Sequence, residues 1–288
     1  MRRPPITSGR QLARAPAAEA VRGGPSQGSP ELLTVDTADG VQLVASRYGG
    51  PAADVAVVFG HGFTGHQFNP RITHFASGLA RSGLAVYTFD FRGHGRRGGR
   101  STFGDREVFD LEAVVQCARA RHPTVVSSGA SMGAFVALRH AGLGGQVDAV
   151  VAISSPASAE PSPLPRARIL GRLIRSDRGR RLLHHYGTRT EPFAPVASAP
   201  LDLVAGISPV PVALLHGTQD PYVPLSDAFA LYERLGDPRR LVVLLRFGHA
   251  EASFRAGFVD AFEVVVRDVL QSAQSEPLWR TFACLVDR

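Results

Sequence analysis

The residues most able to do chemistry form a pentapeptide at positions 129–133, with the sequence Gly-Ala-Ser-Met-Gly. It separates a strand-like run at residues 123–128 from a helix-like run at residues 135–140. A serine at so sharp a turn presents its hydroxyl on an exposed tip, and the flanking glycines leave room for the neighbouring strand and helix. Because the chain contains 30 glycines, a chance G-x-S-x-G is not rare. Ser131 is therefore a candidate nucleophile only if the rest of the chain supplies its partners.

The elements that must position this turn are visible as alternating apolar runs and helix-length segments. The apolar runs lie at residues 55–59, 84–89, 124–126, 147–153, 210–215 and 241–245. They are preceded by two short runs that flank the turn pair Asp39-Gly40, a pattern that predicts a β-hairpin. Helices are expected to begin near Pro70, Glu107, Met132 and Leu225, and a last one to cover about residues 251–271. Such near-continuous apolar strands are typical of a parallel sheet covered by helices on both faces.

Polar and glycine-rich segments follow several of these strands. Ligands of open α/β sheets bind beyond the carboxyl ends of the strands, so those ends are where a site is expected. The segments are Gly-His-Gly-Phe-Thr-Gly at 60–65, Asp-Phe-Arg-Gly-His-Gly at 90–95, the Ser131 turn, His-Gly-Thr-Gln-Asp-Pro at 216–221 and Gly-His at 248–249.

This ordered set resembles the α/β-hydrolase superfamily, and within it the serine esterases, monoglyceride-lipase-like enzymes and S33-type serine peptidases. The resemblance covers about residues 31–271. It implies an α/β fold with a mostly parallel eight-stranded sheet, helices on both faces and a short inserted helical cap. The chain order of nucleophile, acid and histidine is the order found in that fold.

The resemblance also implies roles for individual residues. Ser131 matches the nucleophile, which needs a base to take its proton. His249 matches that base, and Asp220 matches the acid that orients the imidazole and stabilises its cation. The oxyanion formed on attack needs preorganised donors, and the resemblance assigns these to the backbone N–H groups of Phe63 and Met132.

Other readings of these residues exist. Ser131 alone is compatible with an ordinary helix N-cap. The other carboxylates weighed as the acid are those of Asp90, Asp202 and Asp227, which are expected in a structural turn, ahead of a strand and on the following helix, respectively. The competing histidines lie in glycine-rich turns, at a strand end or in the insertion, and include His61, His94, His184, His185 and His216. Only His249 follows the last strand, and Asp220 lies in the segment directly after the strand before it, ahead of the helix expected to carry Asp227.

The expected activity is hydrolysis of a carboxylic ester or thioester of a small or lipid-like substrate through an acyl-enzyme. Serine at the turn argues against dehalogenases and epoxide hydrolases of this fold, which carry aspartate there, whereas haloperoxidase-like side chemistry stays open. The alternatives are an amidase or prolyl-type aminopeptidase, an acyltransferase, and a non-catalytic binding protein on the same fold. We expect no cofactor and no metal, since no metal-ligand spacing is present.

Residues 155–208 interrupt the strand alternation for longer than an ordinary connection. Apolar residues at helical spacing, interleaved with arginines, predict an inserted helical cap that shapes the substrate pocket; they are Ile169, Leu170, Leu173, Ile174, Leu182 and Leu183. Acidic residues that would bind a substrate amine are few there, which favours esters over peptides. The arginines leave attraction of an anionic substrate or a membrane surface open, although a solvated face is the preferred interpretation.

Composition excludes other functions. The net charge is +7, but all 32 basic residues are arginines and no nucleic-acid motif accompanies them, so a nucleic-acid partner is not expected. Cys117 and Cys284 lie far apart and are read as reduced thiols, compatible with a cytoplasmic location. Residues 1–29 are expected to be a disordered tail, 30–275 the hydrolase domain and 276–288 a C-terminal tail. The oligomeric state is not predicted.

Overall fold

A twisted sheet runs through the whole molecule in the computed structural model, which describes residues 29–95, 98–160, 162–254 and 257–272 and the backbone of two short strands at 19–20 and 282–284. Its ten strands are ordered β1-β2-β3-β5-β4-β6-β7-β8-β9-β10. Their bounds are β1 (Glu19–Ala20), β2 (Glu31–Asp36), β3 (Gln42–Tyr48), β4 (Val55–Gly60), β5 (Ala85–Phe89), β6 (Thr124–Ala130), β7 (Ala149–Ile153), β8 (Val212–Gly217), β9 (Arg239–Leu244) and β10 (Phe282–Cys284).

The pairing of these strands confirms the predicted fold class. β1, β2, β3 and β5 pair antiparallel in succession, and every other neighbouring pair is parallel. Strands β2 to β9 thus form the mostly parallel sheet expected from the sequence, and β1 and β10 extend its two edges. The expected hairpin joins β2 and β3, with Gly40 at φ +83° in its turn.

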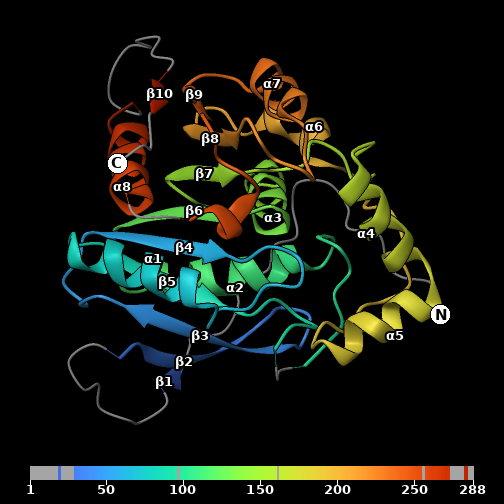
Figure 1. Ribbon diagram of the computed structural model, residues 1–288. Coiled ribbons are helices and arrows are strands. Elements are labelled where there is room, and N and C mark those ends of the chain that lie inside the picture. Colours follow the sequence, from blue (N-terminus) through green and yellow to red (C-terminus); the bar gives the residue numbers. More distant parts are fainter. Residues whose placement is uncertain are drawn as a thin grey trace.

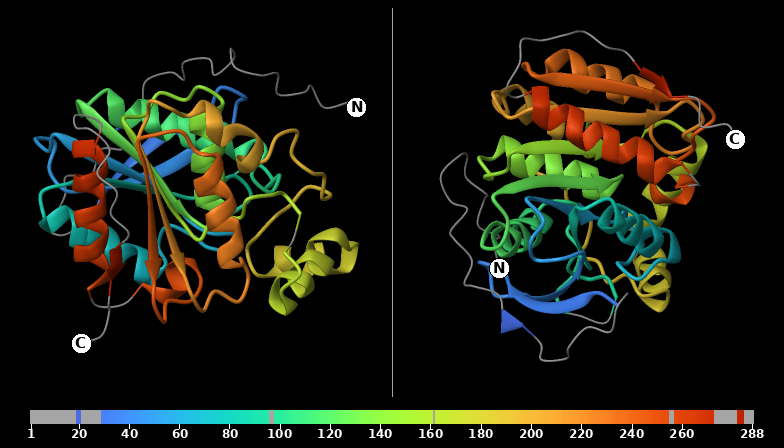
Figure 2. Two further views of the ribbon diagram at one scale, coloured as in Figure 1. Left: turned by 90° about the horizontal axis from the view of Figure 1, so that it is seen from above. Right: turned by 90° about the vertical axis from the view of Figure 1, so that its left-hand side faces the viewer.

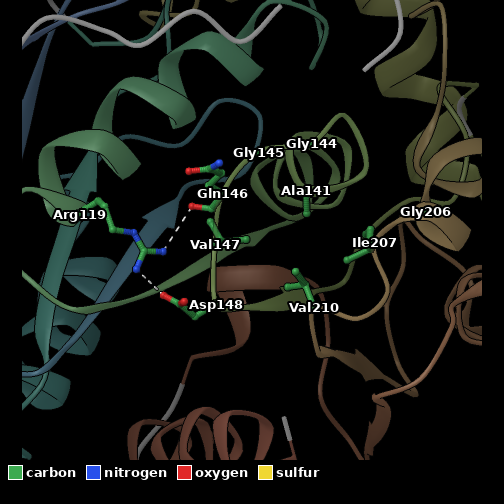
Figure 3. A pocket seen from close by; sticks show the side chains of 10 residues that line it. All are labelled: Arg119, Ala141, Gly144, Gly145, Gln146, Val147, Asp148, Gly206, Ile207 and Val210. Carbon is green, nitrogen blue, oxygen red and sulfur yellow. Dashed lines mark hydrogen bonds and ion pairs between the residues drawn. The ribbon is translucent and has the colours of Figure 1, made fainter. Parts of the chain in front are cut away.

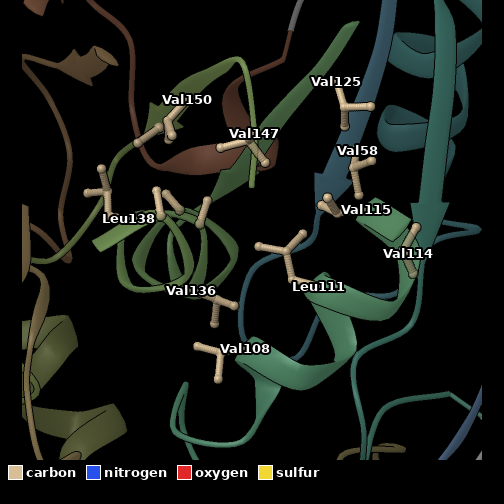
Figure 4. Close-up of a cluster of buried hydrophobic side chains, with 14 of the residues drawn as sticks. Val58, Val108, Leu111, Val114, Val115, Val125, Val136, Leu138, Val147 and Val150 are labelled. Carbon is tan, nitrogen blue, oxygen red and sulfur yellow. The ribbon is translucent and has the colours of Figure 1, made fainter. Parts of the chain in front are cut away.

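Helices cover both faces of the sheet (Figure 1). On one face α1 (Pro70–Arg81) and α8 (Phe258–Ser272) enclose a cluster of buried aromatic and aliphatic side chains. On the other face the cover is α2 (Glu107–Arg119), α3 (Met132–Gly142) and α7 (Leu225–Arg234). Figure 4 shows valines and leucines of α2 and α3 meeting valines of the strands in this second cluster. Burial on both faces explains why the central strands read as unbroken apolar runs.

The inserted segment forms the expected helical cap, built on α4 (Pro165–Arg175) and α5 (Asp177–His185) and followed by the short α6 (Pro200–Leu203) and η1 (Val204–Gly206). The cap helices protrude from the body of the molecule (Figures 1 and 2). Ser176 begins α5 by accepting a hydrogen bond from the Gly179 N–H at 3.0 Å. Of the predicted apolar stripe, Ile174 and Leu183 are buried, whereas Ile169 and Leu182 are exposed.

One predicted element differs from the structure. The last helix was expected from about residue 251, but residues 250–253 form the 3₁₀ turn η2 (Ala250–Ser253) and α8 begins at Phe258. Gly257 takes a φ of +82°, which is incompatible with a continuous α-helix. The expected disordered tail at 1–29 and C-terminal tail at 276–288 lie mostly outside the described residues, apart from β1 and β10.

A buried ion pair fixes the turn that follows β5. Arg92 is 3% exposed and donates two hydrogen bonds to Asp110 Oδ1, from Nε at 2.9 Å and from Nη2 at 2.6 Å. Asp110 Oδ2 accepts the Arg92 backbone N–H at 2.8 Å, and the outer edge of the guanidinium is paired with Asp39 of the β2–β3 hairpin. The arginine thereby joins the hairpin, the turn and α2.

We expect Asp110→Asn to lower the free energy of unfolding by about 3 kcal/mol, because the amide carries no charge to pair with the buried guanidinium and offers one acceptor oxygen where the carboxylate offers two. Urea denaturation of the two proteins measures the difference. Glu263→Gln is the matched control: it breaks the exposed Arg267–Glu263 pair, which is expected to cost about 0.5 kcal/mol or less. Equal stability of Asp110→Asn and the control would contradict the role given to the buried pair.

Candidate functional site

Ser131 lies at the sharp turn between β6 and α3. Its backbone has φ 54° and ψ −113°, a region that non-glycine residues rarely occupy. Two hydrogen bonds of 2.9 Å hold it there, from the Ser131 N–H to the Ile153 carbonyl and from the Phe135 N–H to the Ser131 carbonyl. The end of β7 and the first turn of α3 thus hold Ser131 in this strained conformation.

The two glycines of the pentapeptide are required by the space around them. A Cβ at Gly129 would lie 2.3 Å from the carbonyl carbon of Gly133, and a Cβ at Gly133 would lie 2.1 Å from the carbonyl oxygen of Gly60. Both contacts are with backbone, which cannot move aside. The glycine spacing seen in the sequence is therefore the condition for α3 to pack directly against β6 and β4.

A chain of hydrogen bonds joins the three residues that the sequence singled out. Ser131 Oγ is 2.9 Å from His249 Nε2, and His249 Nδ1 is 2.7 Å from Asp220 Oδ2. Since a carboxylate only accepts, the Nδ1–H of His249 donates to Asp220, and the unprotonated Nε2 is left to accept the hydroxyl proton of Ser131. Three residues from three separate segments are brought into one line.

The carboxylate of Asp220 is held in its ionised form. Burial raises the pKa of Asp220, but the hydrogen bond and charge of His249 and the backbone N–H groups of Val223 and Tyr222 more than offset it, so the net pKa is lowered. Both N–H groups donate to Oδ1 at 2.9 Å, which leaves Oδ2 for His249. Next to it, His216 donates its Nε2–H to the Val223 carbonyl, and burial lowers the pKa of this histidine.

The loop at residues 61–65 lies across from Ser131. A turn closes it, with the Gly65 N–H donating to the Gly62 carbonyl at 2.9 Å and Thr64 at φ +67°. Within the part of the chain that the structure describes, neither the Phe63 N–H nor the Met132 N–H donates a hydrogen bond to another protein group. These two donors are available for a bound molecule.

A cavity of about 390 Å³ opens over Ser131 and His249. One wall is the cap helix α4, which contributes Ile169, Leu170 and Leu173. The other described residues around it are Gly62, Phe63, Thr64, Gly65, Asn69, Arg71, Arg166, Tyr222, Ala250, Glu251 and Ala252. The cavity thus combines the Ser131 hydroxyl, an apolar wall and a loop with free N–H donors.

Comparison with known families agrees with this geometry. A family model described as "Serine aminopeptidase, S33" matches residues 51–194, half of the 288-residue chain. The chain belongs to this family. With its fold it is an α/β-hydrolase.

Individual relatives and solved structures are also similar to this chain. It is similar to the monoacylglycerol lipase of Mycolicibacterium smegmatis, at 34% identity over 41% of this chain and 45% of that protein. The uncharacterized protein YqkD of Bacillus subtilis is 29% identical over 67% of this chain and 64% of its own length. Both alignments thus span less than two thirds of the relative. The Pyrococcus furiosus esterase Pf2001 shares the fold, with a TM-score of 0.68 and 22% identity over 88% of this chain and 99% of that one.

The competing carboxylates of this family member are engaged elsewhere. Asp90 accepts the Gln67 N–H at 2.7 Å, Asp202 accepts the Ala199 N–H at 2.9 Å, and Asp227 accepts the Ala157 N–H at 3.0 Å. Asp227 lies on α7, as expected. Among the described carboxylates, Asp220 is the one bonded to His249.

The histidines in the glycine-rich turns support the loops. His61 donates from Nδ1 to the Gly62 carbonyl at 2.8 Å and accepts the Phe91 N–H at Nε2. Burial lowers the pKa of His61 to about 4. Burial together with neighbouring His61 lowers the pKa of His94 to about 3. Both rings are neutral near pH 7 and serve as hydrogen-bonding supports.

A second cavity of about 470 Å³ lies away from the serine, at the start of β7 (Figure 3). Its charged residues, Arg119 and Asp148, are paired with one another at 2.6 Å, and Arg119 also reaches the Gln146 carbonyl. No nucleophile or base lines it among the described residues. Elsewhere in the described chain, no group of three or more metal-ligating side chains is found, and none of the helices has the length and apolar character to cross a membrane.

Sequence reasoning missed Glu251. This residue follows His249 by two positions and its side chain returns to the loop at 61–65, where Oε1 accepts the Gly62 N–H at 3.0 Å. The signal available in the sequence was an acidic residue close behind the expected base. The expectation of a continuous helix from residue 251 hid it, because a helix would have pointed this side chain elsewhere.

Proposed function

We propose that this chain is a serine hydrolase that cleaves carboxylic esters or thioesters through an acyl-enzyme intermediate. The observation that carries the proposal is the hydrogen-bonded line from Ser131 through His249 to Asp220, open at the serine end to a cavity. Family membership and the likeness to a monoacylglycerol lipase support the same reaction class.

In the first half-reaction the Ser131 hydroxyl attacks the substrate carbonyl while His249 Nε2 takes its proton. Asp220 holds the imidazole in the tautomer that can accept that proton and stabilises the imidazolium that results. The carbonyl oxygen becomes an oxyanion and takes hydrogen bonds from the free N–H groups of Phe63 and Met132. One such donor is worth about 10²–10³ in kcat in enzymes of this kind.

Collapse of the tetrahedral intermediate breaks the ester bond, and the imidazolium gives its proton to the leaving alcohol or thiol. Water then enters, loses a proton to His249 and attacks the acyl-enzyme by the same geometry in reverse. The acid leaves and Ser131 regains its proton. An alcohol or amine in place of water would make the reaction an acyl transfer.

The cavity favours an ester with an apolar acyl chain over a peptide with a free amine. Ile169, Leu170 and Leu173 supply an apolar wall for such a chain. An amino-terminal ammonium needs carboxylate partners, whereas the described charged residues at the cavity are Arg71, Arg166 and a single carboxylate, Glu251, which is bonded to Gly62.

A substrate panel tests the proposal. We expect p-nitrophenyl esters of short and medium acids, and acyl-thioesters, to be hydrolysed with kcat/KM at least about 10²-fold above that for amino-acid p-nitroanilides. Wild-type protein should also be labelled stoichiometrically by a fluorophosphonate probe, which reports an activated serine.

Each alternative has its own outcome in these assays. Preference for the anilides would replace the esterase with an aminopeptidase, and product esters in added alcohol at the expense of free acid would indicate an acyltransferase. Absence of both turnover and labelling would leave the non-catalytic binding protein.

A further inference from the structure

The loop at residues 61–65 is clamped from both sides at Gly62. The Gly62 carbonyl accepts two hydrogen bonds, from His61 Nδ1 at 2.8 Å and from the Gly65 N–H at 2.9 Å. The Gly62 N–H donates to Glu251 Oε1 at 3.0 Å. Both peptide units that meet at this glycine therefore have a fixed orientation.

The orientation of Gly62 decides where the Phe63 N–H points. A trans peptide is planar, so the Gly62 carbonyl and the Phe63 N–H lie in one plane and point in opposite directions. Holding that carbonyl against His61 turns the Phe63 N–H the other way. Because glycine rotates freely about its own backbone, the peptide on its N-terminal side must also be held, and the bond to Glu251 does this.

The Glu251 carboxylate lies close against two glycines of the loop. A Cβ on Gly62 would lie 3.0 Å from its Oε1, and a Cβ on Gly65 would lie 2.9 Å from the same atom. The other oxygen, Oε2, is buried without a hydrogen-bond partner in the described chain, although the residue as a whole is partly exposed. Burial of an oxygen without a hydrogen-bond partner costs free energy of solvation, so the position of this side chain needs an explanation.

Glu251 also belongs to the turn that carries His249. That turn, η2, is fixed to the end of β7, where Ser154 Oγ accepts the Ala250 N–H at 3.3 Å. A single five-residue stretch thus supplies the base and, two positions later, the contact that holds the opposite loop.

We propose that Glu251 is a positioning residue: it holds the loop at 61–65 so that the Phe63 N–H faces the oxyanion that forms on attack by Ser131. This inference rests on the proposed function. Glu251 acts through Gly62 and touches no reacting atom.

The electrostatics of Glu251 are compatible with this role. Burial raises the pKa of its carboxyl, only partly offset by the backbone N–H groups, including that of Gly62, and by the charge of His249. In either protonation state the side chain keeps an oxygen that accepts the Gly62 N–H, so the contact does not depend on the charge of the group.

Two conservative variants separate the effect of the length of the Glu251 side chain from the effect of its acid group. Glu251→Gln keeps the length and an amide oxygen as acceptor, so its kcat should stay within about fivefold of wild type. Glu251→Asp keeps the acid but withdraws the acceptor by one methylene, and its kcat should fall about 10²-fold, the order of one lost oxyanion donor. In both, KM for a p-nitrophenyl ester should change less than about threefold, because the effect lies in the transition state.

A boronic acid, which forms a tetrahedral adduct on the serine, provides the readout that a purely structural role would not move. We expect its affinity to fall in Glu251→Asp in proportion to kcat and to recover in Glu251→Gln. Thermal unfolding, together with complete fluorophosphonate labelling after long incubation, would show that the Asp variant is folded and its serine intact.

The outcomes are distinguishable. Wild-type kcat in Glu251→Asp, or an effect confined to KM, would overturn the positioning role and leave the proposed function standing. Equal losses in Asp and Gln would show that the acid itself matters and would also overturn it. Failure of the wild type to hydrolyse esters or take the probe would instead overturn the proposed function on which the inference rests.

Discussion

Ser131→Ala is expected to lose essentially all esterase activity, with kcat falling by about 10⁵–10⁶ and KM changing only a few-fold. Alanine lacks the oxygen that forms the acyl-enzyme, and among the hydroxyls of the described cavity wall it is that of Ser131 that is hydrogen-bonded to His249 Nε2. The residual rate would come from water positioned by the remaining donors. Steady-state kinetics with a p-nitrophenyl ester and labelling by a fluorophosphonate both measure the change, and labelling should disappear.

Ser127→Ala is the matched control. Ser127 lies on the same strand, four positions before the turn, and its buried Oγ has no hydrogen-bond partner in the described chain. Its loss should leave kcat, KM and labelling within about twofold of wild type, as for a change that removes an unsatisfied hydroxyl. Probe labelling that survives in Ser131→Ala would remove this serine as the nucleophile.

The strands of the central sheet could be predicted from the sequence. Strands covered on both faces are apolar at most positions, so their runs stand out without any pairing information. The glycines that flank Ser131 stand out for a similar reason, since a Cβ added at Gly129 or Gly133 would lie only 2.3 Å or 2.1 Å from backbone atoms. Order along the chain then selected Asp220 and His249 from their competitors.

What the sequence did not reveal depends on contacts between distant segments. The bond from Glu251 to Gly62 joins residues 189 positions apart, and neither residue type announces it. The interruption before α8 is marked by Phe254, whose backbone is extended, and by Gly257 at φ +82°. The edge strand β10 pairs with β9 through backbone groups, which leave little mark on the side-chain pattern of a sequence.

The position of the inserted helices could be predicted from the sequence, but the surroundings of their individual apolar side chains could not. Helical spacing of apolar residues indicates a face and does not say whether the face meets the core, the cavity or solvent. In the structure Ile174 is buried, Leu173 lines the cavity and Leu182 is exposed. Ser176, at the turn between the two helices, caps α5 by accepting the Gly179 N–H.

Asp220→Asn is expected to lower kcat by about 10⁴-fold while leaving the fold and KM nearly unchanged. The reason is the histidine tautomer. An asparagine amide that donates to His249 Nδ1 forces the ring proton onto Nε2, which then cannot accept the proton of Ser131. Because the pKa of Asp220 is held below its usual value, its carboxylate stays ionised as pH falls through the mildly acidic range, so the acid limb of the wild-type pH–rate profile should belong to another group.

Asp227→Asn, which alters a nearby carboxylate bonded to the Ala157 N–H, is the control and should retain activity within about threefold. A loss of less than about tenfold in Asp220→Asn, measured as kcat for a p-nitrophenyl ester, would mean that His249 keeps its tautomer without this carboxylate. The line of three residues would then reduce to a serine–histidine pair.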